Sequence, residues 1–309
     1  MNSSADKVLT YAIHDVTPYI NWIYFFHAWG FQPRFAAIAD IHGCDACRAS
    51  WLTTFSEDDR AKAAEAMQLL KEANRMLNQL DETYHVHTIF RLCKANADGD
   101  NLLLDGTRLP LLRQQIPHPD GSPFLCLSDF VRPLASGTPD TVGIFMRMIP
   151  TYVCRDHPHR EVELLYEDDP YKRMLVQTLA DRLAEAATEK MHEYVRKVAW
   201  GYAKDENLSI PELLKEKFQG IRPAVGYPSL PDQSVNFLLN ELLHMQQIGI
   251  TLTENGAMRP HATVCGLMLA HPAARYFAVG KIGNDQLEDY ARRRGMPINE
   301  VRKFLAANL

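Results

Sequence analysis

Hydrophobic residues recur every three or four positions in several stretches of the chain, which is the spacing of one face of an α-helix. Ser56 precedes one stretch and is followed by three acidic residues, as is typical of a helix N-cap. Ser209 and Glu212 form a Ser-x-x-Glu capping box before another. Helices are therefore predicted at residues 56–80, 172–198, 208–216, 232–247, 284–293 and 298–305.

Alternating hydrophobic and polar positions predict strands between these helices. Residues 84–92 alternate, and a turn at 96–101 leads to 102–104, which predicts an antiparallel hairpin. Further strands are predicted at 124–130, 141–149, 250–253, 262–269 and 275–280. Residues 107–123 lack a period and predict a loop, and residues 1–17 predict an extended lead-in. Because no repeat or low-complexity linker divides the chain, we expect one α+β domain over 1–309.

Residues 18–29 combine Pro18 with a dense set of aromatic and aliphatic side chains. A proline near a helix start and this apolar spacing predict a helix that is buried on most sides. The alternative is that the aromatic side chains form a wall that faces a ligand.

Residues 219–228 fit neither a helix nor a central strand, because they contain two prolines and two glycines. The segment also carries Arg222 and Tyr227. Composition favours a rigid connector, with a binding loop as the alternative.

Composition excludes several classes of protein. The chain has 309 residues, 46% hydrophobic and 23% charged, with a net charge of −5. The absence of a basic stripe argues against nucleic acid as a partner. No run of about 18 apolar residues indicates a membrane span. Six cysteines in a chain of this length do not indicate a disulfide framework, so the expected setting is the reducing cytoplasm.

One cysteine pair has the Cys-x-x-Cys spacing. Cys44 and Cys47 follow His42 closely, but the sequence has no second such pair to complete a structural zinc site. The sequence therefore predicts no metal site, and a zinc protein built on these three residues stays as an alternative that elemental analysis would test.

Common catalytic motifs are missing. The sequence contains no Gly-x-Gly-x-x-Gly after a strand, no Walker-type loop, no Gly-x-Ser-x-Gly and no His-Glu-x-x-His. The dispersed polar residues are Glu185, Glu216, Arg222, Tyr227 and Tyr276. An arginine can hold a carboxylate while acidic groups attract an ammonium, so this set suits the positioning of a zwitterionic ligand.

The C-terminal half contains several strings that occur in the same order in a known family. They cover residues 180–186, 195–202, 206–209, 219–228, 252–254, 271–272 and 286–293. Within them, the Arg-x-x-x-Gly-Tyr of the loop is similar to a cofactor-binding signature. The chain resembles the S-adenosylmethionine-binding activation (reactivation) domain of cobalamin-dependent methionine synthase. The likeness is dense from residue 171 onward and thinner before it.

This resemblance implies a single C-shaped α+β domain, built round a twisted antiparallel sheet flanked by helices, with S-adenosylmethionine along its inner surface. Arg222 would bind the methionyl carboxylate, the Ala224 backbone would meet the adenine, and Gly226 would permit close approach. The tyrosines would flank the ligand, and the glutamates would contact ribose or amino groups. The residues carried over by position are Asn21, Glu185, Glu216, Arg222, Ala224, Gly226, Tyr227 and Tyr276.

The implied activity is part of a methyltransferase reaction. The domain would present the methyl group of S-adenosylmethionine to cob(I)alamin, with cobalamin supplied by the cobalamin-binding module of methionine synthase and an electron by a flavodoxin-type donor. Reduction of the inactive cob(II)alamin form, followed by methylation, would reactivate the enzyme.

Two features depart from the family pattern. The family usually has Asp where this chain has Asn21, which removes a charge opposite the ligand ammonium. The chain also lacks the cobalamin-binding Asp-x-His-x-x-Gly, and Met1 before a lead-in favours a free-standing protein over an excised piece. The alternative function is a non-catalytic interaction module that caps a corrinoid protein without functional S-adenosylmethionine binding.

Overall fold

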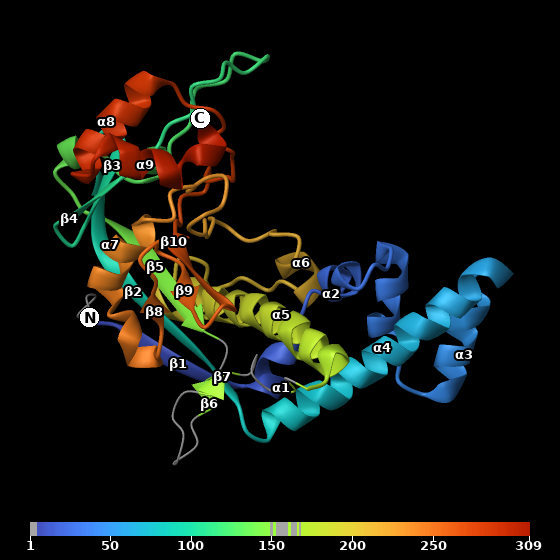
Figure 1. Cartoon of the computed structure of the whole chain (residues 1–309). Helices are drawn as coiled ribbons and strands as arrows, with labels where there is room; N and C mark the ends of the chain where they lie inside the picture. Colours follow the sequence, from blue (N-terminus) through green and yellow to red (C-terminus); the bar gives the residue numbers. More distant parts are fainter. Residues whose placement is uncertain (1–4, 149–150, 153–159, 162–165, 167) are drawn as a thin grey trace.

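A curled antiparallel sheet of six strands forms the centre of the protein (Figure 1). The structure is a computed structural model, and it describes residues 5–148, 151–152, 160–161, 166 and 168–309. The strand order is β10 (Thr263–Met268), β5 (Asp140–Met148), β2 (His85–Ala97), β3 (Asn101–Leu104) and β4 (Thr107–Pro110). Strand β1 (Lys7–Ala12) pairs with the first half of β2, beside β3.

The sheet is buried on both faces, which explains why β2 is rich in apolar residues. On one face Phe90 and Phe145 pack with Met191 of helix α5 (Pro170–Tyr194). On the other face Ile89 belongs to a cluster with Leu239 of α7 (Val235–Leu243). One face of the sheet therefore packs against α5 and holds this helix in position.

The first turns of helix α5 pack in an N-terminal group of helices that share one core, and its last turns lie on the sheet. This group contains α1 (Ile13–Val16), α2 (Trp22–Ala28), α3 (Asp45–Thr53), α4 (Glu57–Asp81) and the 3-10 segments Thr17–Tyr19 and Pro33–Asp40. Ser56 caps α4 as predicted, because its hydroxyl accepts the Asp59 N–H at 3.4 Å. At its other end α5 continues into a π-helical turn, Val195–Ala199.

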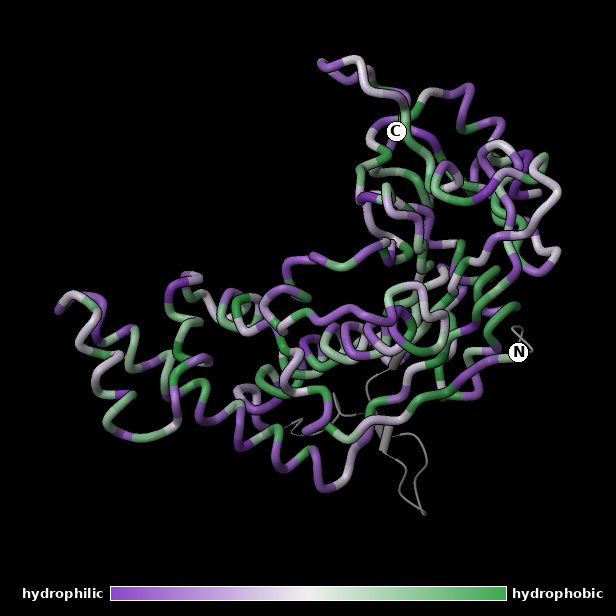
Figure 2. Tube along the Cα trace, turned by 180° about the vertical axis from the view of Figure 1, so that it is seen from behind, coloured by the Kyte–Doolittle hydropathy of each residue, from purple (hydrophilic) through white to green (hydrophobic). Residues whose placement is uncertain are grey.

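The C-terminal helices lie at the opposite end of the molecule. Helices α8 (Asn284–Arg294) and α9 (Ile298–Phe304) pack together, and α8 also contacts β4. With α3 and α4 at the far side of α5, the outline is bent like a C (Figure 1). Seen from behind, hydrophobic stretches follow the central strands, whereas hydrophilic residues are frequent along the arm formed by α3 and α4 (Figure 2).

Shorter elements complete the described part of the chain. Helix α6 spans Ile210–Leu213 behind the predicted Ser209 capping box. Two small ladders join β6 (Thr151–Tyr152) to β7 (Arg160–Glu161) and β8 (Thr251–Leu252) to β9 (Met258–Arg259). The remaining 3-10 segments are Leu127–Phe130, Leu134–Ser136, Met245–Ile248 and Ala306–Asn308.

The N-terminal predictions need correction. Within the described residues of the lead-in, 5–17, the extended stretch is Lys7–Ala12, which is a strand of the sheet, and Ile13 and Val16 of α1 then enter the core. Helix α2 begins at Trp22 rather than at residue 18. It is not buried on most sides, since Tyr24 is 58% exposed.

Three loop and strand predictions are also wrong. The loop expected at 107–123 begins with strand β4, and the strand expected at 124–130 is largely the 3-10 segment Leu127–Phe130. There the Asp129 carboxylate accepts the Cys126 N–H at 2.8 Å and pairs with Arg113, which bends the chain away from a ladder. Residues 275–280 are outside any strand. None of the helices in the described ranges is both long and apolar enough to cross a membrane.

Candidate functional site

A cleft of about 910 Å³ opens between α5, the start of α2 and two irregular segments, 214–229 and 276–278. Its volume lies within the range of small-molecule sites. Seven of the eight residues predicted for ligand binding line it: Asn21, Glu185, Glu216, Arg222, Ala224, Tyr227 and Tyr276. Elements that are far apart in the sequence thus bring the predicted set together.

The segment with the prolines and glycines lies along the edge of β10. Ile221 and Leu269 exchange two backbone hydrogen bonds of 2.9 Å, and the Leu267 N–H donates to the Pro223 carbonyl at 3.0 Å. The Val225 N–H donates to the Cys265 carbonyl at 2.9 Å. The segment behaves as an interrupted edge strand, which a proline tolerates. Its backbone is therefore held by the sheet, and the segment is more than a connector.

Gly266 makes this close approach possible. A Cβ at this position would lie 2.3 Å from the Pro223 oxygen and 2.9 Å from the Ala224 Cα. No side chain fits there, so only glycine in β10 lets the binding segment reach its position. Gly266 was not predicted as a site residue, because a glycine within a predicted strand does not indicate which segment approaches it.

Gly226 is the one predicted residue that does not line the cleft. Its φ of 87° is in the left-handed region, and its N–H donates to the Leu230 carbonyl at 2.8 Å. Gly226 thus turns the chain between Ala224 and Tyr227. The close approach of a ligand that was expected at Gly226 stays a prediction, and the approach of Pro223 to Gly266 is a separate contact within the fold.

Arg222 is held by a carboxylate that the sequence analysis did not single out. The Arg222 Nη1 donates to Glu189 Oε2 at 2.9 Å, and Nη2 donates to the other oxygen of the same carboxylate. Nη1 also lies 3.3 Å from His192 Nδ1. Glu189 follows Glu185 by one helical turn on α5, so its place on the same face could have been predicted from spacing.

His192 supports this arrangement as a neutral base. Burial, and then the positive charges of Arg222 and Arg196, hold its pKa well below the usual range. A neutral imidazole has one nitrogen that can accept, and here Nδ1 faces the arginine donor. Its ring also meets Phe218 edge-on, with 5.0 Å between ring centroids. Arg222 is thus fixed by charge, hydrogen bonding and packing together.

Two further glutamates line the cleft. Glu185 Oε2 accepts from Arg182 Nη1 at 2.9 Å, and the Glu185 side chain is 45% exposed. Glu216 has a positive φ of 55° just before the binding segment. Partial burial of its carboxyl raises its pKa, Arg222 lowers it, and Glu189 raises it again, with a net rise.

Asn21 reaches the cleft as the N-cap of α2. Its side-chain oxygen accepts the Ile23 N–H at 3.2 Å. Asparagine and aspartate cap helices about equally well, so capping does not explain why asparagine stands here.

The segment that contains Tyr276 is tied to the binding segment instead of to a sheet. The Tyr276 hydroxyl accepts the Arg222 backbone N–H at 3.0 Å. The Phe277 N–H donates to the Ser229 hydroxyl at 3.1 Å, and the Val279 N–H to the Pro228 carbonyl at 2.9 Å. These bonds use the backbone groups that a ladder would need, which explains why no strand forms at 275–280.

The charges in the cleft favour a cation. The described lining residues include three acids, Glu185, Glu189 and Glu216, and two bases, Arg182 and Arg222, a balance of −1. The same described residues include no histidine, cysteine or lysine. Such a site can bind and orient a ligand, but it offers none of these groups as a nucleophile or general base.

The fold is α+β, and the charges of the cleft suit a small zwitterionic or cationic ligand. A sequence model described as "Vitamin B12 dependent methionine synthase, activation domain" matches residues 12–295. The chain belongs to this family. A solved structure described as the MetH reactivation domain bound to AdoHcy is 35% identical, with a TM-score of 0.85 over 100% of this chain and 91% of that one.

Proposed function

We propose that this domain binds S-adenosylmethionine in the cleft and presents its methyl group to cob(I)alamin of a methionine synthase. The observation that carries the proposal is the assembly of seven predicted ligand residues, from separate elements, around one cleft. The AdoHcy-bound relative supports it, because AdoHcy is the product of methyl transfer from S-adenosylmethionine.

Charge and shape suit this ligand. S-adenosylmethionine carries a sulfonium, an ammonium and a carboxylate, which sum to +1 and complement the cleft's −1. Glu189 and His192 accept from two of the Arg222 guanidinium nitrogens. The ligand carboxylate would accept from the other N–H donors of that group.

The remaining residues would orient the rest of the molecule. The Ala224 backbone would meet the adenine between Tyr227 and Tyr276, and Glu185 and Glu216 would accept from ribose or amino groups. Because Arg222 and Ala224 lie on a segment bonded to β10, their positions are set before the ligand arrives. Such preorganisation lowers the entropy lost on binding.

Methyl transfer asks only for orientation and exclusion of water on the part of this chain. A corrinoid held by the partner, once reduced by one electron from a flavodoxin-type donor, would supply the electron pair for the new bond to the methyl carbon. The electrons of the broken carbon–sulfur bond would stay on sulfur, so the sulfonium would become a neutral thioether and no proton would move. Because no proton moves, this step asks for no general base from the residues that line the cleft.

A second candidate function is an interaction module that caps a corrinoid protein and no longer binds S-adenosylmethionine. It is favoured by Asn21 in place of the usual acid and by the engagement of Arg222 with Glu189. This function requires docking to the partner but no ligand.

Titration calorimetry with S-adenosylmethionine and with S-adenosylhomocysteine separates the two functions. The informative variant is Tyr227→Ala, because Tyr227 is 57% exposed and its loss leaves the core intact. Leu134→Ala is the control, since Leu134 is also exposed and does not line the cleft.

We expect binding by the natural protein and the control, and weakening of at least about tenfold in Tyr227→Ala. Absence of heat and of thermal stabilisation by either ligand would exclude the main proposal. Methylation of the corrinoid, followed by its absorption spectrum with a methionine synthase fragment that lacks this domain, tests the transfer itself.

A further inference from the structure

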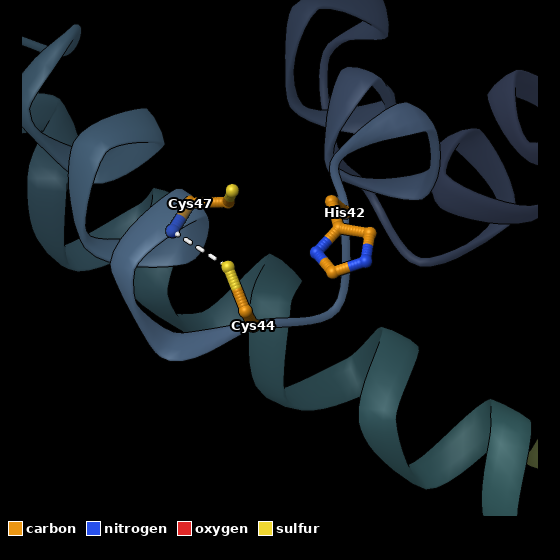
Figure 3. Close-up of side chains that lie close together, drawn as sticks. All are labelled: His42, Cys44 and Cys47. Atoms are coloured by element: carbon orange, nitrogen blue, oxygen red, sulfur yellow. Dashed lines mark hydrogen bonds between the residues drawn. The ribbon is translucent and has the colours of Figure 1, made fainter.

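A cluster of metal-ligating side chains lies at the start of α3, away from the cleft. His42 stands in the link before the helix, Cys44 is its N-cap, and Cys47 is in its first turn. One ligand atom from each residue lies within 4.8 Å of the other two. Figure 3 shows the imidazole and both thiols gathered on the same side of the link.

The helix start favours a thiolate at Cys44. Its sulfur accepts the Cys47 backbone N–H at 3.3 Å, and the positive end of the helix dipole points at it. A thiolate is the form that binds metals.

We propose that His42, Cys44 and Cys47 form a binding site for a zinc ion, with the fourth coordination position taken by water. Two thiolates and one imidazole are ligands that zinc prefers, and three protein ligands with one open position is an established arrangement. None of the three residues lines the cleft, so the inference is independent of the proposed function.

The geometry needs only a small adjustment. Zinc–sulfur bonds of about 2.3 Å and zinc–nitrogen bonds of about 2.0 Å place tetrahedral ligand atoms about 3.5–3.8 Å apart. Atoms that now lie within 4.8 Å therefore have to close by about 1 Å. Cys44 is exposed and Cys47 is partly exposed, so side-chain rotation can supply this movement without repacking the core.

The electrostatic surroundings also fit. Two thiolates neutralise Zn²⁺, so the filled site carries no net charge and the nearby Arg48 guanidinium does not oppose it. That guanidinium lies beside Gly43, where its Nη2 would be 3.7 Å from an added Cβ. A disulfide between Cys44 and Cys47 is the competing chemistry. It would account for the closeness of the two thiols but not for the imidazole of His42 beside them.

Zinc titration of the reduced 309-residue protein, under argon and against a chromogenic chelator, tests the proposal. The variants are Cys44→Ser, Cys47→Ser and His42→Gln. His27→Gln is the matched control, because His27 is also exposed and lies outside the cluster. Circular dichroism confirms that each variant is folded.

We expect one zinc ion per chain in the natural protein and in His27→Gln. Affinity should fall at least about 100-fold in either serine variant and at least about tenfold in His42→Gln. Cobalt(II) in place of zinc should give a thiolate charge-transfer band and the intense visible bands of a tetrahedral site. Absence of stoichiometric zinc binding, or equal affinity in the double variant Cys44→Ser/Cys47→Ser, overturns the proposal.

Discussion

Replacing Glu189 by glutamine tests how firmly the buried Arg222–Glu189 pair holds the binding segment. Both side chains are largely withdrawn from water, at 8% and 14% exposure for Glu189 and Arg222. The substitution keeps a similar shape and one acceptor oxygen, but it removes the negative charge. The guanidinium then loses the carboxylate that it pairs with, and the charge of Glu216 acts on it without a hydrogen-bonded contact.

The magnitude follows from this burial. Removing one partner of a buried ion pair costs about 3–5 kcal/mol, and the retained amide oxygen places glutamine near the lower value, about 3 kcal/mol. For a chain of this size, 1 kcal/mol corresponds to about 2 °C in melting temperature. Glu189→Gln should therefore lower the melting temperature by about 6 °C.

Glu185→Gln is the matched control. Glu185 precedes Glu189 by one turn on α5 and also pairs with an arginine, at 2.9 Å, but its side chain is 45% exposed. An exposed pair contributes about 0–1 kcal/mol, so this variant should lose no more than about 2 °C. Differential scanning calorimetry and urea unfolding measure both losses.

The reasoning fails if the two variants lose the same stability, because burial would then make no difference to the pair. A double-mutant cycle with Arg222→Met sharpens the comparison. Once the arginine is gone, Glu189→Gln should lose far less than it does alone, because no guanidinium is left without its paired carboxylate. A coupling energy near zero would show that the pair does not hold the segment.

Three other changes have distinct expected results. Gly266→Ala should lower stability by about 1–3 kcal/mol and weaken ligand binding, because the new Cβ meets the Pro223 oxygen at 2.3 Å; an unchanged ligand affinity would show that this contact does not place the segment. Asn21→Asp should tighten S-adenosylmethionine binding about tenfold by calorimetry without loss of stability, since aspartate keeps the N-cap and adds a charge; unaltered affinity would remove Asn21 from the site. The folded-state pKa of His192 is depressed, so its contribution to stability is complete above the unfolded value of about 6.5 and is lost as pH falls below it, by at most about 1.4 kcal/mol per pH unit. His192→Gln should flatten urea-unfolding stability between pH 6.5 and 5, and an equally steep loss would contradict this origin.

Much of the local structure could be predicted because its causes are local. The helix at 56–80 has its cap and its apolar period within the same stretch of residues, and α4 spans Glu57–Asp81. The capping box of Ser209 and Glu212 likewise specifies its own helix start. Such elements need no distant partner to be recognised.

The failed strand predictions share a different cause. Residues 124–130 and 275–280 have suitable composition, but their backbone groups are bonded to Asp129 and to the segment near Ser229. Strand β4 was missed for the opposite reason, since its pairing with β3 outweighs a composition typical of a loop. A ladder depends on a partner strand, and periodicity within one segment does not report that partner.

Five polar residues of the ligand-binding set were named from the sequence, and the resemblance added Asn21, Ala224 and Gly226. The structure brings seven of those eight residues to one cleft. Composition alone favoured a rigid connector at 219–228, because prolines and glycines indicate irregular backbone without indicating what it lies against.

The amino-acid sequence by itself determined the long helices α4 and α5, the hairpin, the stiff segment around Arg222 and the family to which the chain belongs. Only the tertiary structure decided that Glu189 on α5 pairs with Arg222, 33 positions later, and that Gly266 makes room for Pro223. Both contacts join elements whose separation along the chain has no period or spacing to reveal it. They exist because the sheet carries α5 on one face and binds the segment at its edge, which is a property of the assembled fold.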